Sequence, residues 1–188
     1  MALSKIDVAN MLTGTIPVDN SKSGSILQVQ STFYNTPFSQ SISADTDTSI
    51  GTSNLKVDIT PTSTSSKIFL FGRLFQEWGN ASGYNVGFFF RRGTTTIGVG
   101  SSEGSRPPVM VINHTSYIQN GAYQLGSTPE TASLYFVDSP ASTAQQTYYI
   151  GVRANTSSTI YVNRTIDDTN NNANERGASE IIAMEIKG

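Results

Sequence analysis

The 188-residue sequence contains no cysteine, which excludes disulfide bonds, thiolate zinc sites and cysteine nucleophiles. Charged residues are also few: 12 basic and 14 acidic side chains leave a net charge of -2. This balance lacks the excess of basic residues that would bind nucleic acid or an anionic membrane surface, so we expect neither partner. The first residues do not form a signal peptide pattern, and no apolar run is long enough for membrane insertion.

Chemistry-bearing residues are equally sparse. His114 is the single histidine, so any Ser-His-Asp machinery would have to use it, and no Gly-x-Ser-x-Gly elbow occurs. No cluster of histidines offers a metal site. Glu103, Glu130 and Asp138 could form an acid pair only if the fold brought two of them together. The sequence therefore predicts a protein that is not an enzyme and that has no cofactor.

Polar turn residues and aromatic residues are abundant. Roughly a quarter of the chain is Ser or Thr, with nine Phe and eight Tyr, a composition typical of short strands joined by polar turns. Alternating segments recur from Ser25 onward, separated by runs of Gly, Asn and Ser. They predict strands at 26–33, 55–60, 66–78, 84–92, 95–99, 108–118, 132–137, 147–154, 159–164 and 179–186, whereas 46–54 is turn-like. We expect an all-β fold, an antiparallel β-sandwich of jelly-roll type over 25–188.

The segment Ser66–Trp78 is the predicted central strand. Ile68, Leu70, Gly72 and Leu74 share one face, and Phe69, Phe71, Arg73 and Phe75 share the other. Both faces are largely apolar, which is typical of a strand covered on both sides. One face of the strand is predicted to be covered by the domain core. The alternation in two later strands predicts further core residues: Tyr148, Ile150, Val152, Ile160 and Val162. The other face of the central strand is predicted to be covered by a neighbouring subunit, and outer aromatics that are simply exposed on a monomer are the alternative. The interface candidates are Phe69, Phe71, Phe75, Tyr149 and Tyr161.

Residues 1–24 differ from the rest. Apolar residues with loose helical spacing are followed by a small, polar linker, so this segment is interpreted as an N-terminal arm that anchors the domain to another protein; a frayed terminus is the alternative. The candidate anchoring residues are Leu3, Ile6, Val8, Met11, Leu12 and Ile16.

Polar loops offer candidate contacts to a glycan. Trp78, with Asn80 and Tyr84 close behind it, could stack on a sugar ring if exposed, or could cap the core. Asp167 and Asp168 precede an Asn run that could bind calcium, although such runs are also the ordinary material of turns.

Several segments taken in order resemble a β-rich module of tail-fibre and other virion proteins of tailed bacteriophages, particularly cyanophages and other aquatic phages. They are 26–30, 57–68, 91–97, 135–140, 149–153, 161–164 and 181–185, and 3–17 is similar to segments that precede this module. The resemblance implies a trimeric, non-enzymatic structural protein located on the virion, attached through its arm to tail, neck or capsid proteins and suited to host adsorption. A capsid decoration (cement) protein without a receptor role is the alternative, followed by a carbohydrate-active enzyme.

Overall fold

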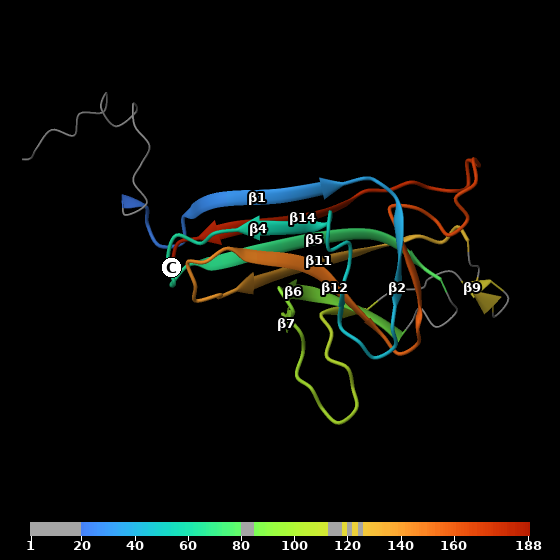
Figure 1. The fold of residues 1–188 in the computed structure, drawn as a ribbon, viewed down its shortest axis with the longest axis horizontal. Coiled ribbons are helices and arrows are strands. Elements are labelled where there is room, and N and C mark those ends of the chain that lie inside the picture. The colour runs from blue at the N-terminus through green and yellow to red at the C-terminus, as the bar shows by residue number, and fades with distance from the viewer. Residues whose placement is uncertain (1–19, 80–84, 113–117, 120–121, 124–125) are drawn as a thin grey trace, which may run out of the picture.

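The computed structural model describes residues 20–188 except 80–84, 113–117, 120–121 and 124–125. The described residues form an all-β fold without an α-helix, and none of them belongs to a helix that could span a membrane. Two antiparallel sheets, here called sheet A and sheet B, pack face to face, which confirms the predicted β-sandwich (Figure 1). The predicted N-terminal arm lies almost entirely outside the described residues.

Sheet A is organised on the twelve-residue strand β5 (Lys67–Trp78). Along one edge, β5 pairs first with β14 (Ser179–Ile186) and then with β13 (Ser158–Val162); β11 (Glu130–Asp138) pairs along the other edge. Outside these lie β1 (Ile26–Tyr34) on β14 and β2 (Phe38–Ile42) on β13. Four strands, in the order β1-β14-β5-β11, therefore run side by side over half of the sheet (Figure 1).

Sheet B is organised on β12 (Gln146–Ala154) and β6 (Val86–Arg92), which pair with each other. The outer edge of β12 pairs with β4 (Lys56–Ile59) and β3 (Thr48–Ser49), and that of β6 pairs with β7 (Thr95–Ile97) and β8 (Val111–Ile112). A separate ribbon joins β9 (Ile118–Gln119) to β10 (Ala122–Tyr123).

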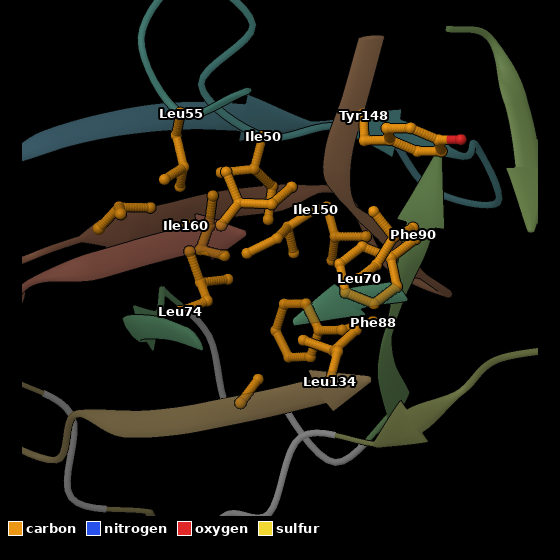
Figure 2. Close-up of a cluster of buried hydrophobic side chains, with 14 of the residues drawn as sticks. Ile50, Leu55, Leu70, Leu74, Phe88, Phe90, Leu134, Tyr148, Ile150 and Ile160 are labelled. Carbon is orange, nitrogen blue, oxygen red and sulfur yellow. The ribbon is translucent and has the colours of Figure 1, made fainter. Parts of the chain in front are cut away.

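The core lies between the two sheets and follows from strand alternation. Ile68, Leu70 and Leu74 of β5 are fully buried, as the period of two requires for one face of a strand. Figure 2 shows Leu70 and Leu74 together with residues of sheet B, such as Phe88 and Ile150. The predicted core residues of β12 and β13 are confirmed, since all of these have no exposed surface: Tyr148, Ile150, Val152, Ile160 and Val162.

One polar cluster bridges the sheets inside the sandwich. Asp138, at the end of β11, accepts hydrogen bonds from Arg92 Nη1 of β6 at 2.7 Å and from Tyr148 Oη of β12 at 2.8 Å. Burial, followed by this hydrogen bond and the Asp138 charge, raises the pKa of Tyr148 above its ordinary value, so the phenol stays a donor. The cluster joins strands of both sheets without leaving its buried carboxylate unpaired.

Some predicted boundaries were wrong. The segment 46–54 was interpreted as turn-like, but it contains β3, and β2 was not predicted at all. The expected strand over 108–118 is reduced to Val111–Ile112 and Ile118 among the residues that are described. These strands are short and lack a run of alternating apolar residues, so tertiary pairing rather than local pattern selects them.

Candidate functional site

The outer face of sheet A, which points away from sheet B, carries a largely apolar surface that includes one charged pair, Arg73 and Glu180. Strand pairing aligns side chains in rows across β1, β14, β5 and β11. We call three of these rows the open face: Val29–Met184–Phe69–Val137, Ser31–Ile182–Phe71–Tyr135 and Phe33–Glu180–Arg73–Ser133. A flanking row, Ile26–Ile186–Lys67, extends it beyond Val29.

The open face is accessible to solvent in the single chain. Tyr135 is 73% exposed, Phe33 59% and Val29 52%. Apart from Ile112, every large apolar side chain that is exposed among the described residues lies on this side of sheet A. Strand spacing and rise give the open face together with its flanking row a surface of about 14 Å by 20 Å between backbone axes, or roughly 300 Å². This largely apolar surface is comparable in size with the largest apolar patch on a typical monomer, which is often functional.

The outer face of sheet B, in contrast, is covered by its own chain. Phe89 points outward from β6 yet has no exposed surface. Asp47, just before β3, accepts a hydrogen bond from Thr96 of β7 at 2.7 Å and one from Arg153 of β12 at 3.1 Å. Since β3 and β7 lie on opposite edges of sheet B, these contacts draw the chain before β3 over the outer face. Among the described residues, sheet A alone leaves a broad apolar face without such a cover.

The far end of sheet A's outer face is closed by loops. Glu77, 2% exposed, accepts hydrogen bonds from the backbone of Gly126, Thr128 and Ile166 at 2.8–3.1 Å. The loop that follows β13 also covers β5, since a Cβ at Gly177 would lie 2.3 Å from the Phe75 ring. This end is therefore part of the folded chain and not of the open face.

The predicted interface residues divide between these surfaces. Phe69 and Phe71 lie on the open face, half-buried among their neighbours. Phe75 lies under the loop at the closed end, and Tyr161 is there too, with the Arg164 guanidinium 5.2 Å above its ring. Tyr149 points outward from sheet B, because its neighbour Tyr148 faces the core. No single surface therefore contains all five predicted interface residues.

Sequence reasoning missed most of the open face. Val29, Phe33, Tyr135 and Val137 lie on edge strands, and no single strand shows that they join Phe69 and Phe71. The available signal was the alternation of each strand, but the strand order that makes the rows contiguous is a tertiary property.

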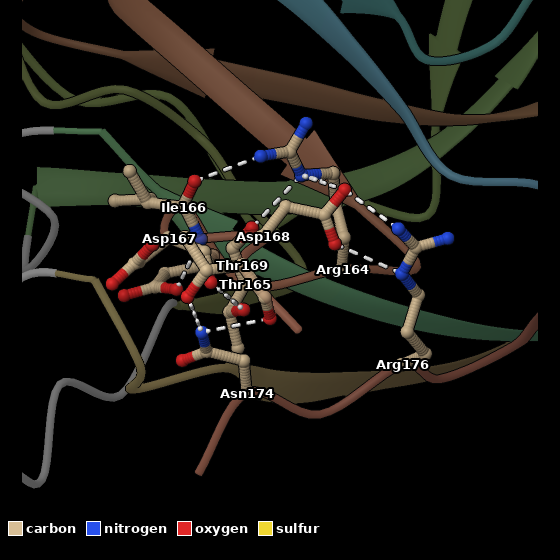
Figure 3. Close-up of polar contacts among 9 residues, drawn as sticks. Arg164, Thr165, Ile166, Asp167, Asp168, Thr169, Asn174 and Arg176 are labelled. Carbon is tan, nitrogen blue, oxygen red and sulfur yellow. Dashed lines mark hydrogen bonds and ion pairs between the residues drawn. The ribbon is translucent and has the colours of Figure 1, made fainter. Parts of the chain in front are cut away.

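The Asp167–Asp168 loop is held by arginines. Figure 3 shows Asp168 beside two guanidinium groups: Arg176 donates to both of its oxygens, at 2.9 and 2.7 Å, and Arg164 Nε lies 3.7 Å away. Asp167 uses its backbone N–H to bind the Gly126 carbonyl. Among the described residues no group of three or more acidic or histidine side chains is placed to hold a metal. The Asp168 carboxylate is thus engaged in a bidentate ion pair within its own loop.

Of the other candidate glycan residues, Trp78 lies among the described residues. Trp78 is 3% exposed and belongs to the core, so the interpretation that it caps the core is confirmed and its ring cannot stack on a sugar. Asn80 and Tyr84 lie outside the described residues, as does His114. Of the candidate acid residues, Asp138 binds Arg92, and Glu103 pairs with Arg106 on the surface.

A pocket of about 330 Å³ opens at one end of sheet B. Its polar lining includes Asp45, Asn85, Arg153 and Asn155, and its apolar lining includes Val86, Gly87, Pro107, Val109, Ile112 and Ala154. Arg153 already binds Asp47 and lies 3.9 Å from Asp45. These lining residues do not place a nucleophile beside a base, so they do not indicate a particular reaction.

Two further carboxylates have perturbed pKa values for structural reasons. Burial raises the pKa of Glu185, but hydrogen bonds from Gln28, Ser66 and Thr62 outweigh burial and hold it below the ordinary value of 4.5. A hydrogen bond from Thr147, opposed by burial and assisted by Lys56, lowers the pKa of Asp58. The carboxylates of Glu185 and Asp58 thus each connect neighbouring strands or turns through their hydrogen bonds.

No protein-family model matches this sequence, and no relative is found among the curated proteins.

Proposed function

We propose that this chain is a structural virion protein of a tailed bacteriophage, a short trimeric fibre-type protein whose copies associate through the open face. The two outer faces differ in how far the chain covers them, and this difference is the observation that carries the proposal. Sheet B buries Phe89 under its own chain, whereas sheet A leaves Tyr135, Phe33 and Val29 more than half exposed. A face of this kind is suited to be the apolar centre of an interface with a polar rim.

The two ends of the sandwich are suited to different tasks in such a protein. Lys187 binds Ser21 and Gly24, so the chain enters the sandwich beside its C-terminal end. The Asp168 loop lies at the opposite end of sheet A, as Figure 1 shows for the segment that follows β13. The arm would attach the domain to tail, neck or capsid proteins at one end, and the loops at the other would face the host surface.

Several copies held together would make weak contacts with a host polysaccharide effective. Each site alone can bind weakly, because linked sites gain avidity from their high effective concentration. The carboxylates described above are engaged in holding strands and loops, which agrees with a structural role for this chain.

Light scattering on the full chain tests the association. We expect the mass of a trimer, with Tyr135→Asp and Phe71→Asp shifting it towards the monomer because each places a charge in the apolar face. Ile112→Asp is the matched control: Ile112 is 67% exposed but lies on sheet B, so its mass should not change. Tyr135 is on an edge strand and largely exposed, so its variant should stay folded even if Phe71→Asp does not. A monomeric wild-type chain refutes the proposed assembly.

Density-gradient purification of particles from a lysate of the producing host tests the virion role. We expect the protein to sediment with the particles, and an Ile6→Asp, Leu12→Asp arm variant to be lost from them. A label attached to the protein and found on the tail or neck of the particles supports a fibre. A label found over the capsid shell identifies a decoration protein. Absence from purified particles contradicts both forms of the proposal.

A further inference from the structure

The charged row of the open face lacks partners within the described part of the chain. Arg73 of β5 and Glu180 of β14 are opposite each other in the register, and both are half-buried. Neither side chain makes an ion pair or hydrogen bond to any residue in the described part of the chain, and Arg73 Nε is buried without an acceptor. Half-buried charges beside Phe71 and Phe33 are costly unless a partner satisfies them.

The order of the rows makes the open face complementary to itself. If two copies meet across an axis parallel to the strands, each row faces the same row of its neighbour, and the strand order β1-β14-β5-β11 is reversed. Arg73 then faces Glu180 of the other copy. Two large side chains of the outer strands face two small ones: Tyr135 opposes Ser31, and Phe33 opposes Ser133. Side-chain size is thus matched in two of the rows and charge in one of them.

We propose that the partner of the open face is the open face of a second copy, with the β5–β11 half of one copy packed on the β1–β14 half of the next. Each contact pairs Arg73 with Glu180 across the interface and buries Tyr135 over Ser31. The inference rests on the proposed assembly and specifies how its copies meet. The same rows face each other in a dimer and in a trimer, because a twofold axis and a threefold axis can each run parallel to the strands.

Charge reversal tests the ionic pairing between copies. Arg73→Glu and Glu180→Arg should each weaken association at least about tenfold, because like charges then oppose each other at every contact. A mixture of the two variants should recover association, because opposite charges meet wherever one variant contacts the other. In a twofold pair every contact is restored. In a ring of three, two of the three contacts are restored. Thermal unfolding of each variant checks that the chain is folded. Two variants that associate as tightly as wild type, or whose mixture recovers nothing, overturn the pairing.

Cysteine cross-linking tests the row matching directly, because the natural chain has no cysteine. Val29 and Val137 are at opposite ends of one row, 52% and 46% exposed. Three strand spacings, about 14 Å, separate them within a chain, so a disulfide between them inside one copy is excluded. In the proposed assembly they face each other across every contact.

The full chain carrying Val29→Cys and Val137→Cys would be oxidised with diamide and analysed on a non-reducing gel. A closed covalent dimer or trimer supports the pairing, and the dimer would revise the copy number in the proposed function. The control combines Val137→Cys with Ile112→Cys, which should remain uncross-linked. An oligomer in light scattering that gives no cross-link, or an open ladder of sizes, overturns the row matching while leaving the proposed function standing. A wild-type monomer refutes the trimeric assembly in the proposed function, whereas the virion role is decided by particle purification.

Discussion

Replacing the buried carboxylate of Glu185 by an amide should destabilise the sandwich strongly at neutral pH. Glu185 lies on β14 with no exposed surface. Its Oε1 accepts from Thr62 N, Thr62 Oγ1 and Ser66 Oγ, each at 2.7 Å, and its Oε2 accepts from Gln28 Nε2 at 2.6 Å. The carboxylate therefore joins β14 to β1 and to the turn before β5.

Glu185→Gln removes the charge with little change in shape. The new amide can keep its oxygen at the Oε1 position, but its NH₂ group then opposes the Gln28 NH₂ group. Leaving one donor unsatisfied costs about 1–3 kcal/mol, and three bonds change from a charged to a neutral acceptor. Relief of charge burial offsets part of this loss, so we expect a net cost of about 2–4 kcal/mol.

The cost should depend on pH in a defined direction. The folded-state pKa of Glu185 lies below 4.5, so the unfolded chain takes up this proton first as the pH falls. The stabilisation is complete above pH 4.5 and is lost as the pH falls through the folded-state pKa. The difference between wild type and Glu185→Gln should therefore narrow in acid.

Urea unfolding, followed by fluorescence of Trp78, measures this difference at a fixed protein concentration. Trp78 is the single tryptophan and is buried, so its emission reports on the core. We expect the midpoint at pH 7 to fall by about 1–2 M. Glu175→Gln, an exposed carboxylate without a hydrogen bond in the described part of the chain, is the control and should change stability by less than about 0.5 kcal/mol. A difference that stays constant down to pH 3 would refute the assigned role of the charge.

Two further predictions concern the packing of the sheets. Gly151→Ala should cost about 1–3 kcal/mol in urea unfolding, because the new Cβ would lie 2.4 Å from Cε2 of Phe89, which is fully buried; an unchanged midpoint would show that the ring moves freely. Asp138→Asn should cost about 1–3 kcal/mol, because Arg92 would keep its charge without a carboxylate partner; thermal unfolding measures it, and a more stable variant would show that the inter-sheet cluster is not stabilising.

Strand alternation predicted the long strands well. The period of two along Ser66–Trp78 separated the core face from the outer face correctly, and the same pattern identified β12, β13 and β14. The short strands β2 and β3 were not predicted, because Phe38–Ile42 and Thr48–Ser49 are largely polar and form strands only through pairing with β13 and β12.

The candidate site was only partly predictable. Phe69 and Phe71 were correctly recognised as an outer apolar pair, since a buried strand with two apolar faces needs two covers. Tyr149 has the same alternation but belongs to the other sheet, and Phe75 and Tyr161 lie at the closed end. A period of two shows that a side chain points outward and does not show which sheet, or which loop, it meets.

The amino-acid sequence by itself thus determined the class of fold, the central strand and the division of each long strand into two faces, because these depend on the spacing of neighbouring residues. Only the tertiary structure decided the strand order, the covering of sheet B by its own chain and the rows that join Val29, Phe69 and Val137 into one face. These depend on contacts between residues far apart in the chain, and such contacts leave no local pattern from which to predict them.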